Sequence, residues 1–193
     1  MSQIAVLNHV SLDGVMQSPA RPDEDTRGGF ALGGCAAPNT DEVMMETVGP
    51  HMGAISVGAL LLGRRTYEDF AAVWPAQTNN PFTPVLDAAT KYVVSTTLHE
   101  PLEWQHSVLL RDLDEVATLK QEFEGDLLVM GSGVLVRSLL ERELVDRLIV
   151  VIHPLLLGKG TRMFADDGRY AELRLTDSVT TPKGVVIATY ERK

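Results

Sequence analysis

The chain has 193 residues and one cysteine, and its 17 Lys and Arg against 26 Asp and Glu give a formal net charge of −9. This charge argues against nucleic acid and acidic membranes as partners, since both are polyanions, and leaves room for a small anion at a local basic patch. A lone Cys35 excludes an internal disulfide, and the scattered histidines have no metal-ligand spacing, so no metal is expected. With neither a signal peptide nor a membrane-length apolar run, we expect one cytoplasmic domain over residues 1–193.

Compact β-branched runs alternate with amphipathic runs along most of the chain. In order, the expected elements are a strand at 4–10, a loop at 18–38, a helix at 40–52, a helix end or turn at 54–57 leading into a buried strand at 60–62, a helix at 66–73, strands at 92–95 and 107–110, a helix at 113–123, a strand at 127–130, a helix at 134–141, a strand at 148–152, and a hairpin of strands 173–179 and 185–190. The alternation predicts a parallel core with crossover helices, to which the hairpin adds antiparallel strands. A Gly- and Pro-rich loop of this length is more typical of a lid or binding loop than of a plain connection.

Two strand ends are followed by glycine and the start of a helix. After the first of these strands come Gly63, Arg64 and Arg65, which offer helix-start amides and forked donors matched to phosphate oxygens. A solvated basic helix start is the alternative interpretation. After the second come Gly131, Ser132 and Gly133, where glycine permits close backbone approach to a pyrophosphate, although a plain strand–helix turn fits equally well. Neither segment is a Rossmann fingerprint or a P-loop.

Two further loops follow buried strands and carry polar residues. Asp13 and Gly14 predict a turn, which Asp13 itself can close. His153 precedes Pro154 and a glycine-bearing loop with Lys159, and a hydrogen-bonded structural histidine is favoured there over a catalytic acid. Because ligands of open α/β sheets bind outside the carboxyl ends of the strands, these loops and the two arginines together favour a phosphorylated ligand such as a nucleotide.

Five segments occur in the order known from one protein family: Ser11-Leu12-Asp13-Gly14, Leu61 through Tyr67, Lys91 through Ser95, Gly131-Ser132-Gly133, and Leu144-Val145-Asp146 through His153-Pro154 to Gly158-Lys159-Gly160. Together they resemble the dihydrofolate reductase-like proteins that share the C-terminal reductase domain of bacterial riboflavin biosynthesis enzymes. The resemblance covers nearly the whole chain. It implies an α/β three-layer fold with a central mixed sheet of about eight strands, flanking helices and a C-terminal antiparallel hairpin, and NADPH as hydride donor.

The resemblance also implies which residues contact the cofactor. The positions that match the phosphate segment are Gly63, Arg64, Arg65 and Thr66, and those near the adenosine 2′-phosphate are Ser95 and Thr96. The glycine loop against the pyrophosphate and the nicotinamide comprises Met130, Gly131, Ser132, Gly133, Val134 and Leu135. Val15 and Met16 match the flexible loop over the nicotinamide, and Asn8 and His9 fall where the first strand faces that ring.

The proton source and the substrate are less closely defined. Candidates for the acid are Asp13, His9 and Asp41, in that order, with ordered water as the alternative and a structural role left open for His9. The helix carboxylate motif of dihydrofolate reductase proper has no counterpart here. Cys35 stands in a stretch that often ends in tryptophan in related proteins, and the smaller side chain widens the pocket.

The function expected from these observations is reduction of a small heteroaromatic or imine-type substrate, such as a pterin, a pyrimidine or a flavin-like ring, by NADPH. Two other hypotheses remain open at this point. The chain would be either a non-catalytic NADP-binding module or an interaction protein that keeps only the fold. The resemblance further suggests a homodimer, formed through the apolar C-terminal strands.

Overall fold

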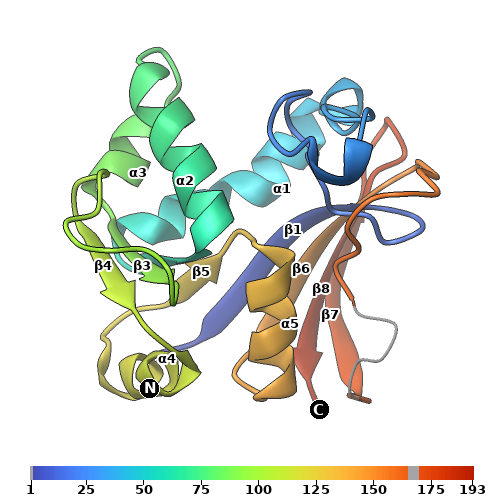
Figure 1. The fold of residues 1–193 in the computed structure, drawn as a ribbon. Helices are drawn as coiled ribbons and strands as arrows, with labels where there is room; N and C mark the ends of the chain where they lie inside the picture. The colour runs from blue at the N-terminus through green and yellow to red at the C-terminus, as the bar shows by residue number, and fades with distance from the viewer. Residues whose placement is uncertain (1, 165–169) are drawn as a thin grey trace.

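The computed structural model describes residues 2–164 and 170–193 and places eight strands in one mixed sheet (Figure 1). Across the sheet the order is β4-β3-β2-β5-β1-β6-β8-β7. The strands are β1 (Ile4–Ser11), β2 (Ala59–Gly63), β3 (Thr90–Val94), β4 (Ser107–Leu110), β5 (Leu127–Val129), β6 (Arg147–His153), β7 (Leu173–Thr180) and β8 (Val186–Arg192). The helices are α1 (Glu42–Gly53), α2 (Arg64–Val73), α3 (Thr83–Ala88), α4 (Leu113–Glu122) and α5 (Gly133–Glu141), with short 3-10 turns between some of them.

The sheet is parallel from β4 to β6 and antiparallel from β6 through β8 to β7. The central strands are continuous apolar runs because helices cover both of their faces; every residue of β2 and of β5 is buried. The expected mixed sheet of about eight strands with flanking helices and a C-terminal antiparallel hairpin is therefore confirmed.

Two apolar clusters form the layers above and below the sheet. Helices α4 and α5 pack on one face through Val116, Val136 and Leu139, against β-strand residues such as Val6. Helices α1, α2 and α3 pack on the other face, where they contribute apolar side chains that include Met44, Tyr67 and Leu86. Because successive strand residues point to opposite faces, neighbouring positions of β1 serve different layers. This alternation decides which side chains at the carboxyl ends of the strands can contact one another.

Most element boundaries lie within two residues of the expected ones, and the starts of two helices have a clear local cause. Helix α2 begins at Arg64, two residues earlier than predicted, because extended Gly63 (φ −79°, ψ 157°) passes directly from strand to helix. Helix α1 begins at Glu42, since the Asp41 side chain accepts a hydrogen bond from the Met44 amide and so caps it. The short helix α3 was not predicted. Within residues 2–164 and 170–193, the structure has no helix of the length and apolar character that a bilayer span requires.

Candidate active site

The two glycine turns meet at the carboxyl ends of the adjacent strands β2 and β5. The Gly63 amide donates to the Gly131 carbonyl at 3.4 Å. A Cβ on Gly63 would lie 2.3 Å from the Ser132 hydroxyl oxygen, and one on Gly131 would lie 2.9 Å from the Thr66 hydroxyl oxygen. The peptide bond between Gly131 and Ser132 is cis. These contacts leave no space for side chains on the glycines, so the backbone itself forms the surface there. The name glycine edge is used below for the two segments Gly63–Thr66 and Gly131–Gly133.

Each turn also opens a helix. Gly63 is the N-cap of α2 and Ser132 that of α5, and among the described residues no side chain caps either helix. The first-turn amides and the positive ends of both helix dipoles therefore face the same edge, an arrangement suited to an anion. Arg64 and Arg65 are exposed beside them. The Arg64 guanidinium pairs only at 4.0 Å with Glu68, which leaves it able to meet a phosphate.

The other cofactor candidates surround the glycine edge at different depths. Met16 packs against Gly133, where an added Cβ would lie 2.8 Å from its sulfur. Ser95 is buried, and its hydroxyl accepts from the amides of Thr97 and Leu98. The remaining candidates divide by burial: Thr96 and Val134 are exposed, whereas Val15 and Leu135 are buried.

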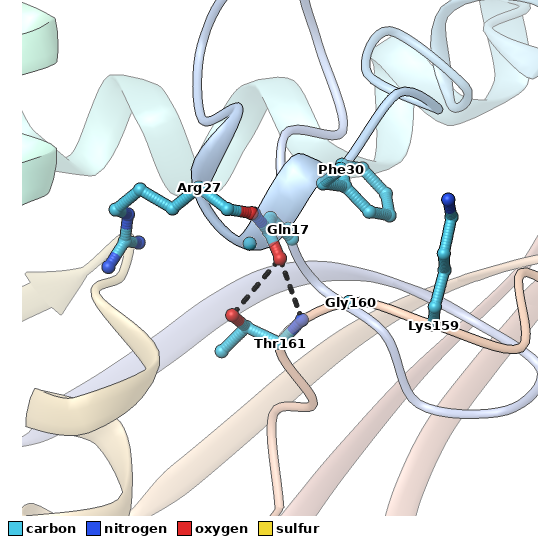
Figure 2. A pocket seen from close by; sticks show the side chains of 7 residues that line it. Gln17, Arg27, Phe30, Lys159, Gly160 and Thr161 are labelled. Atoms are coloured by element: carbon cyan, nitrogen blue, oxygen red, sulfur yellow. Dashed lines mark hydrogen bonds between the residues drawn. The ribbon is translucent and has the colours of Figure 1, made fainter.

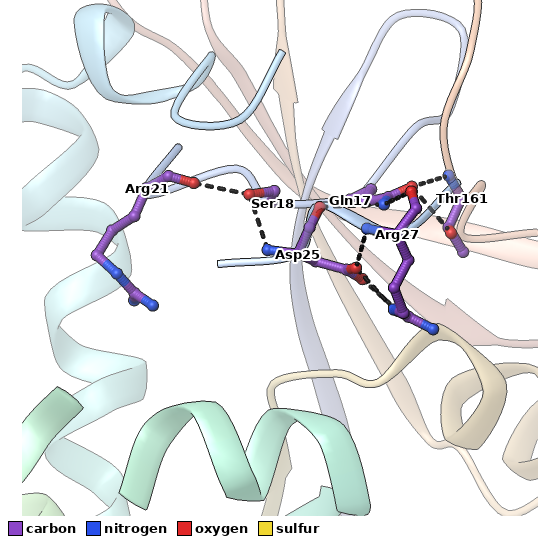
Figure 3. A network of polar contacts seen from close by, with 6 residues as sticks. All are labelled: Gln17, Ser18, Arg21, Asp25, Arg27 and Thr161. Atoms are coloured by element: carbon purple, nitrogen blue, oxygen red, sulfur yellow. Dashed lines mark hydrogen bonds and ion pairs between the residues drawn. The ribbon is translucent and has the colours of Figure 1, made fainter. Parts of the chain in front are cut away.

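A second region lies at the same carboxyl end of the parallel strands. It consists of residues 12–41 and the ends of β1 and β6, and it is called the loop side below. Figure 2 shows Gln17 at its centre, where the amide oxygen accepts from the Thr161 backbone N–H at 2.9 Å and hydroxyl at 3.1 Å. The Gln17 amide nitrogen donates to the carbonyls of Asp25 and Arg27 (Figure 3). One buried side chain thus joins the loop to the segment after β6.

The loop also reaches helix α2, whose first residues belong to the glycine edge. Arg21 forms a two-pronged ion pair with Asp69 of α2, with distances of 2.5 and 3.4 Å, and both side chains are largely shielded from solvent. Between the loop and the segment after β6 lies a cavity of about 310 Å³. Figure 2 shows Lys159 and Phe30 on one side of Gln17 and Arg27 extending on the other. The cavity is large enough for a small ring system.

Two histidines meet beneath the loop. His9 of β1 and His153 of β6 place Nδ1 and Nε2 at 2.9 Å, with their rings stacked at 5.2 Å between centroids. Burial, together with the neighbouring imidazole of His153, lowers the pKa of His9 to about 4, and burial also lowers the pKa of His153. Both imidazoles are therefore neutral near pH 7.

The two carboxylate candidates for the acid are engaged in other contacts. Asp13 accepts from the Ser11 hydroxyl at 2.6 Å and from the amides of Leu157 and Gly158, and these hydrogen bonds lower its pKa to about 2. Asp41 caps α1 and accepts from the Lys183 amide, and its pKa is lowered by the Met44 amide first of all. Carboxylates held in this way are ionised at neutral pH and carry no proton to give.

Comparison with known proteins identifies the family. The sequence model of the RibD C-terminal domain matches residues 3–187. The chain belongs to this family. Among curated proteins, the uncharacterized protein YyaP of Bacillus subtilis (strain 168) is 27% identical over 140 residues, which is 69% of this chain and 73% of that protein.

Solved structures of similar fold include relatives of the RibD family and beyond it. A putative riboflavin biosynthesis protein from Shewanella sp. PV-4 superposes with a TM-score of 0.69 at 22% identity, covering 100% of this chain and 99% of that one. Dihydrofolate reductase from Enterococcus faecalis, in complex with NADP(H) and RAB-propyl, gives a TM-score of 0.62 at 15% identity over 99% and 96% of the two chains. The fold of this RibD C-terminal domain is thus dihydrofolate reductase-like, as expected.

Three features of the RibD-type site were not found from the sequence. The pairing of His9 with His153 follows from the parallel register of β1 and β6, which has no local signal. The Gln17 contacts and the Arg21–Asp69 pair join segments that are far apart in the chain. The long loop between two predicted elements was the one available indication that such contacts existed.

Proposed function

We propose that this protein is an NADPH-dependent reductase that transfers a hydride to a small heteroaromatic or imine-type substrate of the pterin, pyrimidine or flavin-like kind. Membership of the RibD C-terminal domain family supports a reductase. The observation that carries the proposal is the glycine edge, where two uncapped helix N-termini and two exposed arginines converge on a surface without side chains.

The residues at this edge fit the cofactor. Arg64, Arg65 and Thr66 would hold the phosphates, and Gly131–Gly133 would lie against the pyrophosphate. Asn8, on the α5 side of β1, has a buried amide nitrogen with no partner among the described residues, and it supplies a donor for the nicotinamide carboxamide. Ser95 and Thr96 are proposed to lie near the adenosine end. When bound, NADPH would supply the hydride, and the protein would orient the two rings in contact.

Substrate binding is proposed for the loop side. The cavity of about 310 Å³ is bordered by the cation Lys159, by Arg27, whose guanidinium pairs with Asp25, and by the ring of Phe30. This lining suits a flat ring whose negative group meets Lys159. Reduction of an aminouracil of the riboflavin type and reduction of a pterin are the two finer possibilities. Cys35 lines a smaller neighbouring cavity, so its size bears on which ring enters.

The first test is cofactor binding. We expect NADPH to bind more tightly than NADH and to raise the melting temperature, because a ligand that binds only the folded state stabilises it. Replacement of Arg64 by alanine should weaken NADPH binding by roughly tenfold, the loss of one charge-assisted contact. Equal binding of the two nucleotides, or unchanged NADPH affinity in Arg64→Ala, would contradict the assignment.

The second test separates an enzyme from a binding module. Oxidation of NADPH is followed spectroscopically with a panel of pterins, pyrimidines and flavins. Turnover of any panel compound supports the reductase. NADPH binding without turnover across the panel would favour the non-catalytic module instead.

We also propose that the protein is a homodimer. The edge strand β7 is exposed at every position except Val179, and an unpaired strand edge presents free backbone donors and acceptors. Leu173 and Leu175 add apolar surface there, with exposed fractions of 38% and 51%. A monomeric mass in light scattering would refute this proposal.

A further inference from the structure

The two histidines beneath the loop form a defined chemical unit. Strands β1 and β6 pair in parallel with His9 opposite Val151 and Ser11 opposite His153, so both imidazoles lie on the same face of the sheet, the one that carries α1. Their facing nitrogens are 2.9 Å apart, which is a normal hydrogen-bond distance. A hydrogen bond between two neutral imidazoles needs the proton on one facing nitrogen and the lone pair on the other.

Two tautomer arrangements satisfy this bond. In the first, His153 Nε2–H donates to His9 Nδ1, so the outer nitrogen of His9 carries a proton and that of His153 a lone pair. In the second, His9 Nδ1–H donates to His153 Nε2, and the outer nitrogens exchange roles. The pair passes between them when one proton leaves His9 Nε2, one crosses the shared bond and one arrives at His153 Nδ1. Neither ring acquires a net charge.

The surroundings of the pair suit such neutral transfer. A small cavity of about 10 Å³, the room of a single water molecule, is lined by His9, His153, Cys35 and neighbouring residues. The buried Nδ1 of His153 has no partner among the described residues. The described lining contains no Asp, Glu, Lys or Arg. Besides the pair, the titratable group in this described lining is Cys35 from the loop, whose pKa is raised by burial. Ser11, also in the lining, donates to the Asp13 carboxylate.

His9 and His153 differ in their access to a ligand. His153 is 2% exposed, whereas His9 keeps partial exposure at the sheet edge. The small cavity that both rings line shares Gln17 with the cavity of about 310 Å³, and His9 is the more exposed residue of the two. Burial of both rings lowers their pKa values, which disfavours a stored positive charge and is consistent with a unit that stays neutral.

We propose that His9 and His153 form a two-histidine proton relay for the reductase, with His9 Nε2–H protonating the substrate nitrogen that becomes electron-rich on hydride addition. This inference rests on the proposed function and deepens it. The N–H bond of His9 breaks as the substrate N–H bond forms, the proton of His153 Nε2 moves to His9 Nδ1, and water gives a proton to His153 Nδ1. The resulting hydroxide is neutralised in solvent, and the reverse tautomer shift after product release restores the starting state.

Imidazole nitrogen NMR tests the relay without turnover. In the ¹⁵N-labelled protein we expect both rings to remain neutral from pH 7 to 8, and a scalar coupling to appear between His9 Nδ1 and His153 Nε2 across their hydrogen bond. An imidazolium signal from either ring in this range, or the absence of the coupling, would overturn the relay. The control is His51 of α1, which lies outside the pair and is expected to show no such coupling.

Single-turnover kinetics with a reducible panel compound supplies the functional readout. His9→Gln should slow proton-coupled reduction by about 100-fold with little change in KM, a typical value for the loss of an acid. His153→Gln keeps a donor toward His9 but cannot pass a proton on to it. Reduction then depends on hydronium from solvent, so the rate should fall by roughly tenfold per pH unit between pH 6 and 8, where the wild-type rate is flat. His51→Gln should resemble the wild type.

The outcomes separate the two proposals. A flat pH profile in His153→Gln, with a wild-type rate, would assign His153 a structural role and end the relay while leaving the reductase intact. If NADPH binds and the coupling is present but every panel compound is inert, the proposed function fails, and the catalytic use of the pair fails with it. Loss of fold is monitored by the melting temperature of each variant.

Discussion

The glycine edge and the loop side lie at the same end of one sheet, but the first consists mainly of free backbone groups and the second of hydrogen-bonded side chains. At the glycine edge, backbone amides and exposed arginines are left available, and side chains are excluded by contacts such as Gly63 with Ser132. On the loop side, Gln17, Asp13 and the histidine pair are engaged in hydrogen bonds, most of them shielded from solvent. The difference teaches that backbone amides and arginines suffice for the proposed phosphate site, whereas the proposed ring site depends on side chains that other residues hold in place.

The largest expected effect concerns the loop side and pH. The folded pKa of His9 is about 4 against 6.5 in a model compound, so the unfolded chain binds the proton first as pH falls. Stability should therefore decrease between about pH 6.5 and 4, by roughly 2–3 kcal/mol from this residue. Urea denaturation at pH 7.5 and 4.5 measures the loss, which should be smaller in His9→Gln; an equal loss in that variant would show that other groups govern it.

The next effect concerns the glycine edge. Gly63→Ala places a Cβ 2.3 Å from the Ser132 hydroxyl, so the two turns must move apart. We expect a loss of roughly 1–3 kcal/mol in unfolding free energy together with weaker NADPH binding. Gly49→Ala is the matched control, because nothing lies within 4 Å of the added atom inside helix α1, and there alanine should stabilise slightly. Equal unfolding free energies for the two variants would contradict the claim that close packing requires glycine at position 63.

The smallest effect concerns the ion pair between Arg21 of the loop side and Asp69 of α2. Arg21→Gln removes the shielded pair with Asp69 and should cost about 1 kcal/mol while increasing amide exchange over residues 18–38. Arg142→Gln breaks a pair with Asp114 at the same 2.5 Å distance, but one whose carboxylate is 81% exposed, and should change stability little. Unchanged loop exchange in Arg21→Gln would show that Gln17 alone holds the loop.

Most of the fold was accessible from the sequence because its signals are local. The buried strand at 60–62 and the terminal hairpin around the Thr181–Gly184 turn could be predicted from apolar runs and turn residues, and both are confirmed. Helix α3 was missed because its six residues follow Pro81 and include Pro84, which give no periodic signal. The early start of α2 depends on the backbone of Gly63, which a sequence pattern does not specify.

The site was less accessible because its decisive contacts are long-range. The sequence favours Asp13 first as an acid, but it cannot show that amides at Leu157 and Gly158, about 145 positions further along the chain, bind its carboxylate. The sequence favours a hydrogen-bonded structural His153, but it cannot show that the register of β1 and β6 makes His9 its partner. Composition and periodicity indicate local secondary structure and the buried face of each element. They do not indicate which strands pair or in which register.

The direct passage from β2 into α2 at Gly63 has a consequence for how relatives of this chain can diverge. One inserted residue there would rotate the helix by about 100° and carry Arg64 and Arg65 away from the glycine edge, so the proposed phosphate site disfavours length changes at this junction. The loop over residues 18–38 carries no such penalty, since doubling a loop's length costs only about 0.6 kcal/mol. Changes in the length of this loop are therefore the expected route by which relatives alter the loop side while the glycine edge stays the same.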